Sequence, residues 1–245
     1  MPLRLLAILA LSLLLFGCNE SVNQDLKKDN DMTSLKLKLD DKKASFELKA
    51  DDEKKKDYKE GIESVEKSGI VVTAKQLGQQ APDFTLNNAL GKPVSLRDYL
   101  KKGKVVLTWY RGGWCPYCNL TLHQLQQELP NFTANGATLL ALTPELPDKS
   151  ITTAEKHALE FEVLSDIGNK VAKQYGIVFK LTDEVAKRYN DGFGLNDFNG
   201  NESNELPLAA TYIINESGEI IYAFLDADYR NRAEPSELTE FLKKD

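Results

Sequence analysis

The sequence has few residues that bind metals or cross-link a chain: it contains three cysteines and two histidines in 245 residues. Three cysteines exclude a disulfide-stapled scaffold. A formal net charge of -6 argues against a nucleic-acid partner, because phosphates favour a basic protein surface. Fifteen glycines and nine prolines are ordinary usage, which excludes collagen and low-complexity polymers. There are too few apolar runs for a polytopic membrane protein. What remains is one sizeable globular domain with additional segments.

The first 18 residues resemble an export signal. A short basic start precedes a largely apolar run from Leu5 to Phe16, followed by a glycine and Cys18. The run has the length of a signal-peptide core and is too short to span a bilayer. The cysteine position resembles the lipobox of bacterial lipoproteins, although Phe16 is bulkier than usual there. The resemblance implies a lipoprotein signal peptide at 1–18, lipidation of Cys18 and an anchor on the extracytoplasmic, periplasmic side of a membrane. An ordinary cleaved signal peptide and an uncleaved anchor are the alternatives, and both also export the chain.

Residues 19–76 form a charged segment in which lysine, aspartate and glutamate dominate and nearly cancel. We expect a flexible tether over about 19–32, followed by one or two solvated helices that end near Gly69. A partner-binding coiled coil is the alternative, but the segment has no sustained heptad. The prediction is therefore a charged tether and helical arm.

From residue 77 to 245, short apolar runs alternate with helical spacing, which predicts an α/β domain. The expected elements are strands at 105–110, 137–142, 211–214 and 220–224, a helix that keeps its apolar spacing until Pro130, and a closing helix after Pro235. The first two strands and the helix between them form a β-α-β unit with parallel strands, and the last two strands form a hairpin. This order predicts a thioredoxin-like α/β/α fold with three layers and a mixed central sheet.

Two thiols, Cys115 and Cys118, stand two residues apart at the predicted start of the first helix. At a helix start, unpaired N–H groups and the helix dipole stabilise a thiolate, and the spacing allows a reversible disulfide. A zinc site would need more ligands, and only His123 and His157 remain. No metal or cofactor is therefore expected.

The surroundings of the two cysteines carry weaker signals. We expect Trp114 and Tyr117 to form an apolar collar around the sulfurs. His123 lies one helical turn further on; a solvated surface residue is favoured over a base. Turn residues dominate 181–206, which predicts a surface loop near the site, with a substrate lid as the alternative.

Several motifs together resemble the peroxiredoxin-like branch of the alkyl hydroperoxide reductase and thiol-specific antioxidant superfamily. They are 81–86 (APDFTL), 111–119 (RGGWCPYCN), 164–166 (LSD), 226–229 (DADY) and 232–235 (RAEP). The resemblance covers residue 77 to the C-terminus, with weaker similarity back to about residue 35. It implies a thioredoxin-type fold and thiol-dependent reduction of hydroperoxides.

The sequence departs from a conventional peroxiredoxin at the assisting residues. A gapless match places the peroxide-attacking cysteine at Cys118, with Arg111 in the usual proline position and Cys115 in the usual threonine position. Ala209 stands where the family has an arginine, and where thioredoxins have a cis-proline. Peroxide cleavage needs donors on both oxygens, so Arg111 is the candidate to replace the missing guanidinium.

The predicted function is an antioxidant thiol peroxidase with Arg111, Cys115 and Cys118 as catalytic residues. One cysteine becomes a sulfenic acid, the other condenses with it, and an external dithiol, of the thioredoxin type, reduces the disulfide. A thioredoxin-like exchange enzyme for protein disulfides is the first alternative, in which Cys115 attacks. A non-enzymatic, redox-responsive lipoprotein is the second.

Overall fold

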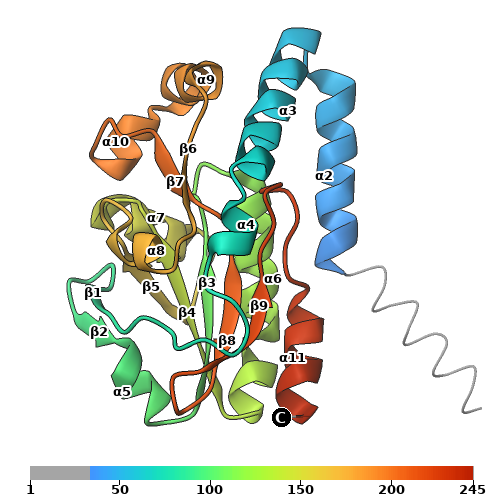
Figure 1. Cartoon of the computed structure of the whole chain (residues 1–245). Helices are drawn as coiled ribbons and strands as arrows, with labels where there is room; N and C mark the ends of the chain where they lie inside the picture. The colour runs from blue at the N-terminus through green and yellow to red at the C-terminus, as the bar shows by residue number, and fades with distance from the viewer. Residues whose placement is uncertain (1–33, 245) are drawn as a thin grey trace, which may run out of the picture.

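The structure is a computed structural model that describes residues 34–244 (Figure 1). The predicted signal peptide at 1–18 and the predicted tether at 19–32 lie outside the described residues. Within them, no helix is both long and apolar enough to cross a membrane. The helices are α2 (Leu35–Lys49), α3 (Asp52–Lys67), α4 (Ile70–Thr73), α5 (Leu96–Leu100), α6 (Pro116–Ala134), α7 (Pro147–Lys156), α8 (Lys170–Gln174), α9 (Asp183–Phe193), α10 (Leu195–Asn199) and α11 (Pro235–Lys244). The strands are β1 (Thr85–Asn87), β2 (Pro93–Ser95), β3 (Lys104–Trp109), β4 (Ala137–Thr143), β5 (Glu162–Ser165), β6 (Val178–Lys180), β7 (Glu205–Pro207), β8 (Thr211–Ile214) and β9 (Ile220–Phe224).

The central sheet has five strands in the order β5-β4-β3-β8-β9. β3, β4 and β5 are parallel, as the β-α-β pattern predicts, and β8 and β9 run antiparallel to their neighbours. The hairpin turn is closed by Asn215, whose side chain accepts the backbone N–H groups of Ser217 and Glu219. The predicted mixed sheet is therefore confirmed.

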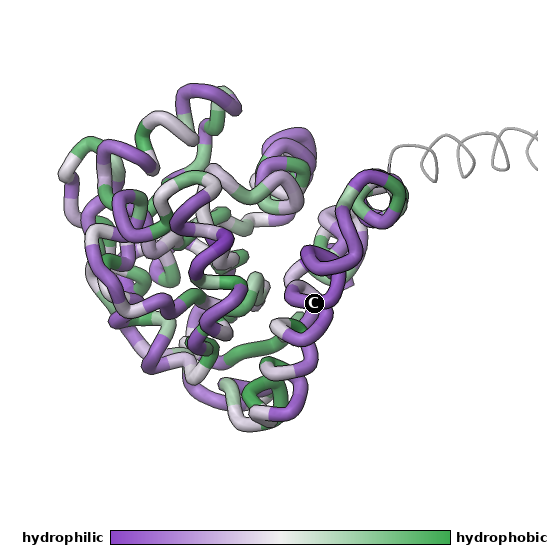
Figure 2. The backbone as a smooth tube through the Cα atoms, turned by 90° about the horizontal axis from the view of Figure 1, so that it is seen from above, coloured by the Kyte–Doolittle hydropathy of each residue, from purple (hydrophilic) through white to green (hydrophobic). Residues whose placement is uncertain are grey.

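Each face of the sheet is covered by its own helices, because alternate strand residues point to opposite sides. Val106, Leu139 and Ile213 are fully buried on the face that packs against α6, α11 and the start of α2. Their neighbours Val105 and Leu140 are buried on the other face, in the core that includes α4, α5 and α8. Figure 2 shows hydrophobic residues along inner segments and hydrophilic ones along much of the outer backbone. These layers position the carboxyl end of β3 at the start of α6.

The helical arm packs on the domain more closely than the predicted solvated helices would. Leu35 and Leu39 of α2 are almost fully buried in the core beside α6, and Ile62 and Val65 of α3 are buried as well. Gly69, at a φ of 71°, separates α3 from α4, where the sequence predicts the helix end. The sparse apolar residues of the arm therefore anchor it to the domain.

Two other local predictions are wrong. Residues 181–206 are not a surface loop, because α9 and α10 occupy most of the segment; Thr182 caps α9 by accepting the N–H of Val185. Helix α6 also continues past Pro130 to Ala134. A proline removes one N–H from the helix, and the packing of the following Phe132, which is fully buried, retains the last turn.

Candidate active site

The two cysteines lie where β3 ends and α6 begins. Cys115 is the residue before the first helical turn, with an extended backbone, and Cys118 is in that turn. The loop leading to them contains Gly112, whose φ is 151°; a side chain there would collide with the indole of Trp114. The glycine therefore allows the chain to turn tightly from the sheet into the helix.

Both thiols are free and almost completely buried, with 1% and 0% of Cys115 and Cys118 exposed. Cys118 Sγ accepts the backbone N–H of Arg111 at 3.5 Å and Nη2 of Arg232 at 3.5 Å. Nη1 of Arg111 lies further, at 3.9 Å, from Cys115 Sγ. The donors of the site therefore converge on the sulfur deeper in the helix.

This asymmetry separates the acidities of the two thiols. Burial alone would raise the pKa of Cys118, but a hydrogen bond from Cys115 and the charges of Arg232 and Arg111 outweigh it and lower the pKa to about 5. Burial and the neighbouring Cys118 sulfur raise the pKa of Cys115 well above its ordinary value. These opposite shifts of the two pKa values favour Cys118 as the thiolate of the pair and Cys115 as its protonated partner.

Arg111 is a buried cation without a carboxylate beside it among the described residues. Its Nη2 donates to the hydroxyl of Tyr189 at 2.7 Å, and the guanidinium carbon lies 3.9 Å from the ring centre of Tyr229. The ring of Trp114 lies on the same guanidinium at 5.0 Å. Aromatic faces thus hold the cation, whose Nη1 lies beside Cys115 Sγ and whose charge also lowers the pKa of Cys118.

Arg232 is the first of two site residues that the sequence alone does not identify. It lies between β9 and α11, where Nη1 donates to the backbone carbonyl of Asn231 at 2.7 Å while Nη2 reaches Cys118. The sequence signal is the 232–235 motif, which contributes to the family resemblance but does not by itself indicate a contact with Cys118. Only the fold brings this loop, more than a hundred residues away, to the start of α6.

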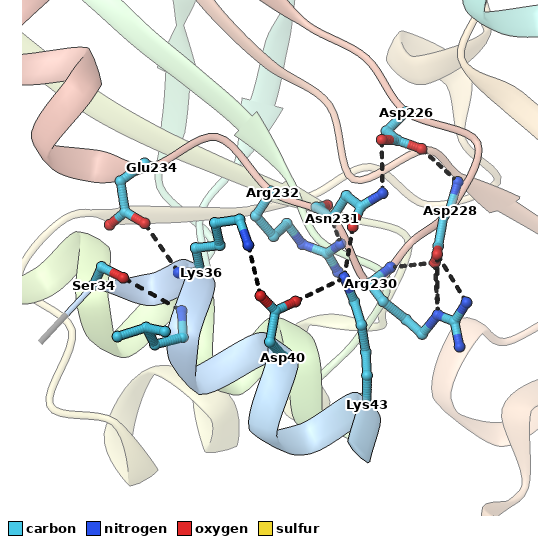
Figure 3. Close-up of polar contacts among 11 residues, drawn as sticks. Ser34, Lys36, Asp40, Lys43, Asp226, Asp228, Arg230, Asn231, Arg232 and Glu234 are labelled. Carbon is cyan, nitrogen blue, oxygen red and sulfur yellow. Dashed lines mark hydrogen bonds and ion pairs between the residues drawn. The ribbon is translucent and has the colours of Figure 1, made fainter. Parts of the chain in front are cut away.

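The loop that carries Arg232 is tied to the arm. The carboxylate of Glu234 accepts the backbone N–H groups of Leu35 and Lys36 at the start of α2, each at 3.0 Å. Figure 3 shows the contact with Lys36. Lys43, on the same helix, donates to the side chain of Asn231 at 2.7 Å. The arm therefore supports the segment that positions a donor on Cys118.

A second missed residue is Glu145, which follows β4 and is fully buried. Its carboxylate accepts the backbone N–H of Gly113 at 2.9 Å. Burial raises the pKa of Glu145 to about 7, although the Gly113 N–H opposes this rise. Glu145 therefore holds the loop before Cys115. No sequence pattern marked it, because the contact depends on how β3 and β4 pair.

The collar residues and His123 lie as the sequence analysis expected. Trp114 stacks on Phe193 of α9 with ring centres 4.4 Å apart, and Tyr117 meets Tyr229 edge-on at 5.7 Å. His123 is exposed and contacts Gln127 of its own helix. In the part of the chain that the structure describes, no group of three or more histidine, cysteine or acidic residues is arranged to hold a metal ion.

A pocket of about 370 Å³ opens over Cys115. Cys115 and Arg111 belong to its lining, whereas Cys118 does not. Its walls come from α2, α3 and α9 as well as from the loop before α6. The segment at 181–206 thus forms a helical wall of this pocket.

The buried thiolate has a consequence for stability against pH. Because the pKa of Cys118 is lower in the folded chain than in an unfolded one, its contribution to stability is complete above the ordinary cysteine pKa and is lost as pH falls through about 5. We expect the melting temperature of the reduced protein, relative to the disulfide form, to rise between pH 5 and pH 8. Calorimetry of both forms across this range measures it. A difference that does not change with pH would contradict a thiolate at Cys118.

Residues 77–223 match the model of the AhpC/TSA family. The chain is 31% identical over 148 residues to a putative peroxiredoxin, Bcp, of Haemophilus influenzae, covering 60% of this chain and 84% of that protein. It is 23% identical over 170 residues to the thiol-disulfide oxidoreductase ResA of Bacillus thuringiensis, covering 69% and 78% of the two chains. The solved structure of peroxidoxin BcpB from Mycobacterium tuberculosis is similar with a TM-score of 0.55 and 19% identity, covering 69% of this chain and 97% of that one. This likeness confirms the predicted thioredoxin-like fold.

Proposed function

Because the chain belongs to the AhpC/TSA family, we propose that it reduces hydroperoxides as a thiol-dependent peroxidase in which Cys118 attacks the peroxide. The observation that carries the roles is the convergence of two donors, the backbone N–H of Arg111 and Nη2 of Arg232, on Cys118 Sγ. A thiolate is the nucleophile in this chemistry, and these donors keep Cys118 ionised.

The reaction proceeds in two steps within the protein. The Cys118 thiolate attacks one peroxide oxygen, the O–O bond breaks, and the leaving alkoxide takes up a proton to become an alcohol, or water if the substrate is hydrogen peroxide. Arg111 and Arg232 donate to the charge that develops as the bond breaks. The Cys115 thiol then attacks the sulfenic acid on Cys118, and water leaves as the disulfide forms. Two electrons from an external thiol donor restore both thiols.

Arg111 and Arg232 can replace the guanidinium that the conventional family pattern has and this chain lacks. Ala209 cannot supply a guanidinium, but the structure has two others within reach of the sulfurs. This supports the interpretation of Arg111 as a replacement donor and adds Arg232 to it.

We expect each molecule of peroxide to oxidise both thiols of one molecule of the reduced protein. Alkylation with a mass-shifting reagent before and after peroxide, combined with peroxide consumption in the presence of excess dithiol, measures this. A matched sample treated with buffer alone controls for air oxidation. If two free thiols persist after peroxide and none is consumed, the proposed function is wrong.

Disulfide exchange is the second candidate function. Cys115 belongs to the lining of the pocket while Cys118 lies behind it, as an exchange enzyme that attacks with the first cysteine would require. The raised pKa of Cys115 argues against this order, because a protonated thiol is a poor nucleophile. Mixed disulfides with protein substrates in a Cys118→Ser variant would favour exchange.

The proposed location is the periplasmic side of a bacterial membrane, with a lipid on Cys18. The proposal depends on the lipobox resemblance, since residues 1–33 lie outside the described part of the chain. Labelled fatty acid should appear on the full chain and disappear in Cys18→Ser, because the modification needs that sulfur. If the wild-type chain carries no label, an export signal without lipidation replaces the proposal.

A further inference from the structure

The pocket over Cys115 has a charge unlike that of the whole protein. Its lining includes Lys42, Lys49 and Lys54 of the arm and the buried Arg111, and it includes no aspartate or glutamate. The chain as a whole has a net charge of -6. None of the three lysines forms an ion pair within residues 34–244. The pocket is therefore a local site for an anion.

The pocket walls are aromatic. Phe46 of α2 stacks on Tyr58 of α3 with ring centres 5.4 Å apart, and Tyr58 meets Tyr189 of α9 edge-on at 5.8 Å. Trp114 and Phe193 complete this wall. Figure 1 shows α3 and α9 standing above the end of the sheet, on the same side as the start of α6. An apolar wall and a few convergent polar groups in a volume of about 370 Å³ are typical of a small-molecule site.

Because Cys115 lines the pocket and Cys118 does not, the pocket fits the reduction of the disulfide better than the attack on peroxide. In the disulfide form, a thiolate that enters the pocket meets Cys115 first, because Cys118 is not part of the lining. Attack on Cys115 expels Cys118 as a thiolate. Cys118 is the better leaving group of the two, since Arg111 and Arg232 stabilise its charge.

We propose that this pocket binds the reducing substrate, and that this substrate is a low-mass thiol bearing carboxylates. The proposal rests on the proposed peroxidase function, which supplies the disulfide. The incoming thiolate forms a bond to Cys115 Sγ as the Cys115–Cys118 bond breaks and Cys118 leaves as a thiolate. A second thiol then attacks the mixed disulfide, releases the thiol's own disulfide and leaves Cys115 reduced and protonated. The two electrons that the peroxide removed are thus returned by two thiols.

The arm supplies the lysines and two of the aromatic residues that would select a carboxylate-bearing thiol. The three lysines, Phe46 and Tyr58 all precede residue 77, where the match to the AhpC/TSA family begins. Cys115 is only 1% exposed beneath them, so a folded donor would have to displace the α2–α3 hairpin to reach the sulfur. A small thiol instead matches the volume of the pocket, about 370 Å³, whose lining includes Cys115.

The test compares reduction of the preformed disulfide by three probe thiols of different charge. The full chain is oxidised with diamide, so that peroxide reactivity is not required, and is then reduced by mercaptosuccinate, 2-mercaptoethanol or cysteamine. In a variant with Lys42→Gln, Lys49→Gln and Lys54→Gln, we expect the rate constant for mercaptosuccinate to fall about tenfold, the order of effect of three nearby charges acting through water. The rate constant for neutral 2-mercaptoethanol should change less than about twofold, and that for cysteamine should rise. High salt should reduce these differences.

The matched control removes three other arm lysines, Lys56, Lys59 and Lys67, which lie outside the pocket lining. This control variant has the same net charge as the pocket variant. Its rate constant for reduction of the disulfide by mercaptosuccinate should stay close to that of the wild type. Equal losses in both variants, or a loss that does not depend on the charge of the thiol, would overturn the proposal. It would also be overturned if the pocket variant slowed oxidation by a carboxylate-bearing hydroperoxide while thiol reduction stayed unchanged. Absence of any peroxide oxidation in the wild type would instead refute the peroxidase function, and the reduction assay would still report on the pocket.

Discussion

The Cys118→Ser variant is expected to consume hydroperoxide roughly a thousandfold more slowly, or not measurably, because it removes the nucleophile. Cys115→Ser should retain one turnover and stop at a sulfenic acid on Cys118, since the thiol that resolves it is missing. A dimedone-type reagent and mass spectrometry of the labelled peptide locate the sulfenic acid. The two variants carry the same Cys→Ser substitution at positions three residues apart, so each is a control for the other.

The opposite pattern would reassign the roles. A sulfenic acid at Cys115 in the Cys118→Ser variant, with an inert Cys115→Ser variant, would make Cys115 the attacking sulfur despite its raised pKa. If neither variant traps a sulfenic acid and the intact protein consumes no peroxide, disulfide exchange replaces peroxide reduction as the function.

Arg232→Met is expected to slow oxidation of the protein by hydroperoxide about a hundredfold, the effect of removing one donor from a developing charge. The same change should raise the pKa of Cys118, because it removes a cation 3.5 Å from the sulfur. The thiolate absorbance at 240 nm, followed against pH, reports this pKa independently of turnover. Arg232→Lys should recover part of both effects by restoring the charge.

Arg230→Met is the matched control for this prediction. Its guanidinium pairs with Asp228 at 2.8 Å, so it changes the charge of the same loop by the same amount. We expect its peroxide rate and the pKa of Cys118 to stay close to those of the wild type. If Arg230→Met and Arg232→Met reduce the rate equally, Arg232 acts by supporting the loop and not as a donor to Cys118.

The same contacts predict the behaviour of the disulfide. Arg232 favours the form of the protein that contains a thiolate, so the wild-type disulfide should be easily reduced. Arg232→Met should make reduction less favourable, and the reduction potential should become more negative. Equilibration with defined ratios of reduced and oxidised dithiothreitol measures the direction of this shift.

The main elements of the fold could be predicted from the sequence because their signals are local. Continuous apolar runs around 105–110 and 137–142 indicate strands buried on both faces, and the turn at 215–218 indicates the final hairpin. The segment at 181–206 was misread because α9 has few apolar residues, and its turn residues resemble a loop. Val185 and Tyr189 become buried only when they pack beside α3 and the site. Tertiary packing here stabilises helices that local propensity alone does not indicate.

At the candidate site, one short motif was enough to predict the pair of thiols, their place at a helix start and the nearby Arg111. Which of the two thiols the charges favour depends on contacts that form only in the folded chain. Position at the helix start would by itself favour Cys115 as the more acidic thiol, but the loop that carries Arg232 lies against Cys118. Electrostatic interactions depend on distances in space, and a guanidinium more than a hundred residues away along the chain outweighs the position within the first helical turn. The arm likewise became part of the site only through packing, because its lysines and aromatic residues meet Cys115 solely in the folded chain.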